Sequence, residues 1–213
     1  MKTRKRIMLQ IGVALGLVLL VAVPQGGAQS FQTMDISTPV LNDKLASGGF
    51  LTSKPIPVVG NIVGSAEPQE NLTQGDTIYL KIKPGTQVKP GDTFLLARFG
   101  REVLHPVTKE KMGAVVRFSG LAIILDGRGE TIPAFIKRSF IQISYNDVLV
   151  PMVSFPTSLS LRVSHRQEGM IVASPEGEEN ISQNEVVYID RGMRDGLIKG
   201  DVFTIYQWPY YEK

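Results

Sequence analysis

Apolar and polar residues alternate over short stretches in most of the chain after residue 57. Between residues 77 and 83, Ile78, Leu80 and Ile82 alternate with more polar residues, and residues 132–136 and 158–164 show the same period. A period of two places successive side chains on opposite faces of a strand, so each stretch predicts a half-buried strand. Apolar or β-branched runs at residues 93–96, 114–118, 120–125, 148–150 and 202–205 predict further strands.

A helical period is absent from this pattern. Beyond the N-terminal region, no stretch of ten or more residues shows a convincing period of 3.6. Closely spaced short strands predict an all-β fold, a short-stranded sandwich or barrel. Residues 29–57 contain Pro39, Pro55 and Pro57 and no sustained period, which predicts a linker with room for a short helix around residues 36–46.

The chain also repeats itself. Residues 61–99 align without a gap on residues 170–208, at a constant offset of 109 positions. Identical pairs include Ile62 with Ile171 and Tyr79 with Tyr188. Such self-similarity predicts one structural unit used twice. We therefore expect a β-domain at residues 58–152 and an incomplete second repeat at residues 153–213, which would complete its core against the first or against another chain.

Each copy contains a Gly-Asp pair before an apolar run, VKPGDTF at residues 88–94 and LIKGDVF at residues 197–203. Glycine accepts a positive φ and aspartate bonds nearby backbone N–H groups, so the pair reverses the chain readily. Gly91, Asp92, Gly200 and Asp201 are therefore predicted turn residues. The string also matches the start of a lysin motif (LysM), but no helical period follows it, so we interpret it as a turn.

The N-terminus predicts export. Four basic residues, Lys2, Arg4, Lys5 and Arg6, precede an apolar run at residues 7–23, and Gly26-Gly27-Ala28 follows. This pattern is typical of a secretory signal over residues 1–28, cleaved after Ala28 or, as a close alternative, after Ser30. A retained membrane-anchor helix is the other interpretation. Either way we expect a periplasmic or cell-envelope protein, attached to the membrane only if the segment is retained.

Charge and composition exclude several classes of function. Removing residues 1–28 takes away four basic residues and leaves 19 basic and 20 acidic ones, a net charge of −1. Nucleic acid is then not an expected partner, because phosphates need a retained basic surface. The chain has no cysteine, which excludes disulfides, thiolate metal sites and a cysteine nucleophile. His105 and His165 lack metal-ligand spacing and we expect both to be structural.

The C-terminal aromatic cluster is the candidate binding site. Tyr206, Trp208, Tyr210 and Tyr211 lie within six residues, around Pro209. Aromatic side chains could stack on sugar rings or anchor a partner. The alternative is a last strand whose Tyr206 and Trp208 cover the edge of the core.

Four motifs together resemble a known family. They are VKPGDTF, HPVTKEKMG at residues 105–113, a strand with Ala134 and Ser139, and the segment from Ile171 to Tyr206. Over residues 60–208 the chain resembles the β-rich domain that follows LysM modules in bacterial envelope proteins, and more distantly the C-terminal domain of the flagellar assembly protein T. Lys109 stands where that family has a glycine. The LysM module, which carries the family's carbohydrate binding, is absent.

These observations predict an exported, non-enzymatic binding or scaffolding protein of the cell envelope, without metal or cofactor. Peptidoglycan and envelope proteins are the expected partners, and an oligomer could form through the incomplete repeat. The alternative is an accessory component of a flagellar or outer-membrane assembly. A wall-active hydrolase is the weaker alternative, because the sequence shows no clustered catalytic residues.

Overall fold

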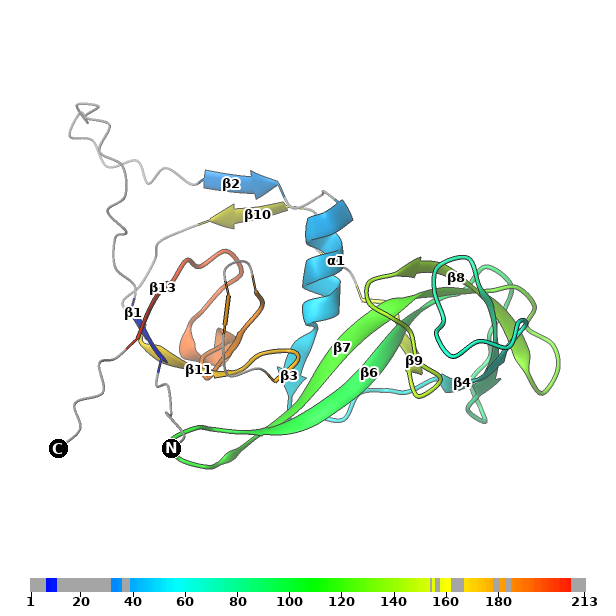
Figure 1. The fold of residues 1–213 in the computed structure, drawn as a ribbon, viewed down its shortest axis with the longest axis horizontal. Coiled ribbons are helices and arrows are strands. Elements are labelled where there is room, and N and C mark those ends of the chain that lie inside the picture. Colours follow the sequence, from blue (N-terminus) through cyan, green and yellow to red (C-terminus); the bar gives the residue numbers. More distant parts are fainter. Residues whose placement is uncertain are drawn as a thin grey trace.

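The computed structural model describes residues 7–10, 32–35, 39–153, 155, 158–161, 167–177, 181–182 and 185–207. Antiparallel strands dominate these residues, and the predicted all-β class is confirmed for them. A barrel stands at one end of the molecule and a smaller β-unit at the other, with two long strands running between them (Figure 1).

Seven strands form the main sheet. Their bounds are β3 (Phe50–Thr52), β4 (Gly60–Ser65), β5 (Thr77–Ile82), β6 (Thr93–Leu104), β7 (Lys111–Ile124), β8 (Ile132–Ser139) and β9 (Val148–Pro151). The order is β3-β7-β6-β9-β4-β5-β8, and a further pairing of β7 with β8 closes all but β3 into a ring. Because the ring is closed, each strand in it is paired on both sides and has no free edge there.

The barrel core follows from the predicted alternation. In β5, Ile78 and Leu80 are buried while Tyr79 and Lys81 are exposed. The buried side chains inside the ring include Ile62, Leu96, Ile136 and Leu149. Strand β7 does not alternate, because it is covered on both sides over much of its length. It therefore appears in the sequence as an apolar run instead of an amphipathic strand.

Strands β6 and β7 extend beyond the barrel as a hairpin arm, residues 98–117. Strand β3 adds to β7 along this arm, through Phe50↔Val116 and Thr52↔Ala114. Helix α1 (Pro39–Gly48) also packs on β7. Residues 39–48 and 50–52 of the predicted linker are thus a helix and a strand attached to the sheet. The hairpin turns at residues 105–110, where Lys109 has a φ of 62°, the left-handed conformation that glycine adopts readily.

The second β-unit contains β11 (Gly169–Ala173), β12 (Tyr188–Ile189), the 3₁₀ turn η1 (Met193–Asp195) and β13 (Thr204–Gln207). Its internal register matches that of the first unit at the offset of 109. Ile62 pairs with Leu80 in β4 and β5, and Ile171 pairs with Ile189 in β11 and β12. The register of β4 with β5 shifts between Ile62 and Gly64. The register of β11 with β12 shifts at the equivalent place, between Ile171 and Ala173.

Two short strands come from the N-terminal part of the chain. Strand β2 (Gln32–Asp35) pairs with β10 (Ser158–Leu161), and β1 (Ile7–Gln10) pairs with β11 and β13. Residues 7–10 lie in the predicted signal and are extended rather than helical. The other residues of the predicted signal are outside the described part of the chain. Among the described helices, none has the length and apolar character needed to cross a membrane.

Candidate binding surface

The predicted aromatic site is described at one position. Tyr206 lies in β13 and is half-buried. Desolvation raises the pKa of Tyr206, and the negative charge of Glu168 raises it further. Trp208, Tyr210 and Tyr211 lie outside the described residues. The aromatic cluster therefore stays a prediction.

The predicted Gly-Asp pairs have matching geometries. Gly91 and Gly200 have φ angles of 90° and 97°. The Asp92 carboxylate accepts a hydrogen bond from the Lys89 N–H at 3.0 Å, and Asp201 accepts one from the Ile198 N–H at 2.8 Å. These are tight turns that start β6 and precede β13. Because the carboxylates of Asp92 and Asp201 bond the chain's own backbone, we interpret both Gly-Asp pairs as structural turns.

His105 connects the tip of the arm to the second unit. Its Nδ1 accepts hydrogen bonds from the N–H groups of Val107 and Thr108. Nδ1 is thus an acceptor, and Nε2 lies 3.3 Å from Asp190 Oδ2, to which it donates in the neutral tautomer. Both ring nitrogens are therefore engaged within the protein. His165 lies outside the described residues, and no group of three or more metal-ligating residues occurs among the described ones.

A continuous apolar surface covers the outer side of the sheet. Because paired residues in an antiparallel ladder share a face, the register defines its rows. The first row joins Phe50, Val116 and Phe99 across β3, β7 and β6. Behind it lie two further rows, which are Phe118, Ala97 and Val148, and then Leu121, Leu95 and Val150. We call these nine residues the outer apolar surface.

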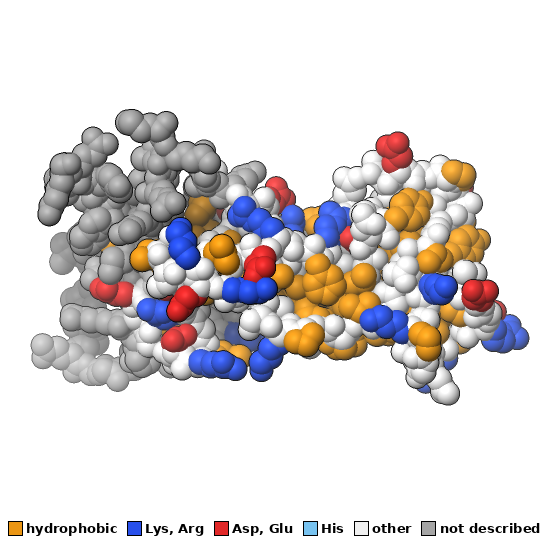
Figure 2. All heavy atoms as spheres, turned by 90° about the horizontal axis from the view of Figure 1, so that it is seen from below, with side chains coloured by type: hydrophobic (Ala, Val, Ile, Leu, Met, Phe, Trp, Pro, Cys, Tyr) orange, Lys and Arg blue, Asp and Glu red, His pale blue; other side chains and the backbone are white. Residues whose placement is uncertain are grey.

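Only part of this surface is covered by the chain itself. Phe140 and Phe155 pack over the second and third rows, and the Phe155 ring meets that of Phe118 edge-on at 5.6 Å. The first row is open at its two ends, where Phe50 is 38% and Phe99 46% exposed, while Val116 between them is fully buried. Figure 2 shows hydrophobic side chains gathered in the middle of the face seen from below. Two exposed aromatic side chains in one row are a feature that binding surfaces share.

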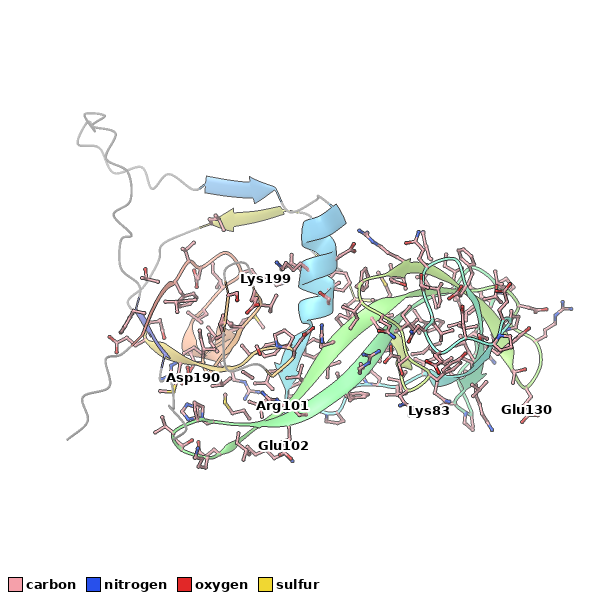
Figure 3. All side chains as sticks on the ribbon, in the orientation of Figure 1. Lys83, Arg101, Glu102, Glu130, Asp190 and Lys199 are labelled. Carbon is pink, nitrogen blue, oxygen red and sulfur yellow. The ribbon has the colours of Figure 1, made fainter. Side chains whose placement is uncertain are left out.

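The opposite side of the arm is occupied by the second unit. Val103 and Val115 of the arm pack with Ala173 and Tyr188. Around this contact, Arg117 pairs with Glu176 at 3.2 Å, and the Tyr188 hydroxyl donates to the carbonyl of Gly48. Asp190 and Arg101 lie on the facing sides of this junction (Figure 3). The arm thus has one face docked on the second unit and one face open.

A cavity of about 240 Å³ remains at this junction, between α1, β7 and the second unit. Lys44, Arg117, Glu176 and Glu185 are among the residues that line it. Arg117 already pairs with Glu176, and Glu185 accepts the Ser182 N–H at 2.7 Å. The charges around the cavity are thus largely used within the protein, which makes it a weaker candidate than the open aromatic row.

The open row was not predicted from the sequence. Phe50 lies in the predicted linker, and Phe99 follows the predicted strand at residues 93–96. One signal could have extended that strand, because Leu95, Ala97 and Phe99 continue its period of two. Nothing in the sequence places Phe50 in the same row as Phe99. Comparisons of the chain with family models, with curated proteins and with solved structures find no match.

Proposed function

We propose that this is an exported, non-enzymatic scaffolding protein of the bacterial cell envelope, which binds another protein through the open row of its outer apolar surface. The N-terminal sequence supports export. The single observation that carries the binding proposal is the exposure of Phe50 and Phe99 on a sheet face that is otherwise apolar. Water contact with two aromatic rings is unfavourable, and because Phe50 is 38% and Phe99 46% exposed, a partner that covers them gains roughly 0.5–1.5 kcal/mol for each ring.

The chemistry of the surface favours a protein partner over peptidoglycan. Glycans present many hydroxyl groups, and these need hydrogen-bond partners when they leave water. All nine side chains of the outer apolar surface are hydrocarbon. An apolar protein segment leaves no polar group unsatisfied there. A role in an assembly of envelope proteins, such as a flagellar or outer-membrane assembly, follows from this more directly than wall binding does.

The test is a crosslinked recovery of partners from the envelope, with purified sacculi sedimented in parallel. The unaltered protein should recover a defined set of proteins and should not sediment with sacculi. Phe99→Asp should reduce recovery about tenfold, because it places a charge where an apolar contact forms. Leu125→Asp is the matched control, since Leu125 is 50% exposed but is not part of the outer apolar surface.

Two results would contradict the proposal. Sedimentation with sacculi that Phe99→Asp abolishes would make the same surface a wall-binding site. Equal partner recovery by the unaltered protein and by Phe99→Asp would show that the open row does not carry binding.

A further inference from the structure

The second unit repeats the strand order of half of the barrel. In the barrel, β9 lies between β6 and β4, and β5 follows β4. In the second unit, β1 lies between β13 and β11, and β12 follows β11. Strands β4, β5 and β6 correspond to β11, β12 and β13 at the offset of 109. Strand β1 therefore occupies the position that β9 holds in the barrel.

The registers of the two central strands agree on both sides. Leu149 of β9 pairs with Gly60 and with Leu96. Adding 109 to the residue numbers of these two partners gives Gly169 and Ile205. Both of these residues pair with Leu9 of β1. Leu9 thus stands where Leu149 stands. Agreement on both neighbours shows that the position between β11 and β13 is a strand slot with a defined register.

In the barrel this slot holds an apolar strand. Strand β9 has the sequence VLVP, and Leu149 is fully buried. Both neighbouring strands bond its backbone. A slot of this kind needs an occupant, because the facing backbone N–H and C=O groups of two strands are otherwise left without ladder partners.

The segment in the slot of the second unit belongs to the predicted secretory signal. Cleavage after Ala28 removes residues 7–10 from the protein and opens the slot between β11 and β13. A second copy of the exported chain lacks the same segment, and its own β9 is built into its barrel.

We propose that the exported form binds, in the slot between β11 and β13, an extended apolar segment of another envelope protein. The segment runs antiparallel to both strands and places a large aliphatic residue at the position of Leu9. This is recognition by strand addition, in which backbone hydrogen bonds supply affinity and the apolar side chain supplies register. The inference rests on the proposed function, since it needs an exported protein with a protein partner, but it uses a different surface.

The experiment uses protein purified after export, with its N-terminus determined by mass spectrometry, and a fluorescent peptide of residues 5–12 as the probe. The peptide should bind with a dissociation constant in the micromolar range. The same peptide with N-methylated backbone amides at residues 8–10 should bind at least tenfold more weakly, because it cannot complete the ladder. Equal binding of both peptides, absence of binding, or an exported protein that retains residues 1–28 would overturn the proposal.

The register is tested by disulfide trapping. Only the introduced cysteines can react, because the chain has none of its own. A peptide with cysteine at the Leu9 position should form a disulfide with Ile205→Cys at least tenfold faster than with Val202→Cys. Ile205 is the register partner of Leu9, whereas Val202 is an exposed residue outside the strand. Equal rates would overturn the proposed register and with it the slot.

These results separate the two proposals. Peptide binding in register, without recovery of any envelope protein, would retain the slot and reject the scaffolding function. Recovery of partners that Phe99→Asp reduces, by an exported protein that does not bind the peptide, would retain the scaffolding function and reject the slot.

Discussion

At the scale of single residues, acidic side chains organise the turns of this protein. Asp92, Asp201 and Asp147 each accept a hydrogen bond from the backbone N–H three residues earlier. Asp147 has a second function, because its carboxylate also receives Arg98 at 2.8 and 3.1 Å. The Asp147 side chain is fully buried, whereas that of Arg98 is 37% exposed. Arg98 in turn donates to the Gln142 carbonyl at 2.8 Å.

Replacing Asp147 by alanine should lower the free energy of unfolding by about 3 kcal/mol. The change removes the partner of the Arg98 guanidinium and leaves the Ser144 N–H without its acceptor. Urea denaturation measures the loss. Asp126→Ala is the control, since the pair of Asp126 with Arg128 is exposed and should contribute little. Similar losses in the two variants would contradict this account.

At the scale of elements, the arm depends on the close approach of β3 to β7. Gly113 has a φ of 129°, and a Cβ there would lie 2.2 Å from the carbonyl oxygen of Thr52. Only a glycine lets the two backbones pair at this point. Gly91 also has a positive φ, but a Cβ there would meet no atom within 4 Å. An alanine at Gly91 therefore introduces backbone strain alone, whereas an alanine at Gly113 introduces strain together with steric overlap.

Gly91→Ala should cost about 1 kcal/mol, the strain of a left-handed residue with a Cβ. Gly113→Ala should cost roughly 2 kcal/mol more, because the overlap with Thr52 displaces β3. Hydrogen exchange should show faster exchange of the β3 amides in Gly113→Ala alone. Unchanged protection of β3 in that variant would show that its pairing does not depend on Gly113.

At the scale of the whole molecule, Tyr188 holds the second unit to the arm and to α1. Its side chain packs on Val103 and Val115, and its hydroxyl donates to the Gly48 carbonyl. Burial raises the pKa of Tyr188 to about 12. The folded protein therefore favours the neutral phenol more strongly than the unfolded chain does, in which tyrosine ionises near pH 10.

The stabilisation from this group is complete below pH 10 and is lost as the pH rises from 10 to 12. Between pH 9 and pH 12 the unaltered protein should lose about 2 kcal/mol more than Tyr188→Phe. Other tyrosines ionise in both proteins and cancel in the difference. Denaturant unfolding across this pH range measures it, and parallel pH profiles of the two proteins would show that Tyr188 is not the titrating group.

Local pattern was sufficient for several of the strands and for the Gly-Asp turns, but not for β3 or for the arrangement of the strands. The alternation at residues 77–83 and 132–136 predicted β5 and β8, whose alternate residues face the core and solvent. Helix α1 and strand β3 were predicted only as a linker with a possible short helix. Their stability comes from packing on β7, which a local period does not contain.

The candidate surface shows the same limit. Phe50 and Phe99 fall in one row because both pair with Val116 of β7, one from each side. His105 and Asp190 meet across 85 positions of sequence for a similar reason. Contacts of this kind depend on which strands pair, and the sequence around each residue carries no record of its distant partner.

The sequence by itself determined the β-rich class, the Gly-Asp turns and the offset of 109 between the two units. Periodicity, turn chemistry and self-similarity are local properties that each segment carries alone. Only the tertiary structure decided that β7 and β8 close a barrel, that the arm leaves one aromatic row open, and that β1 occupies the position of β9. These features depend on strand register, which is set when distant backbones satisfy one another's hydrogen bonds and bury a shared apolar face.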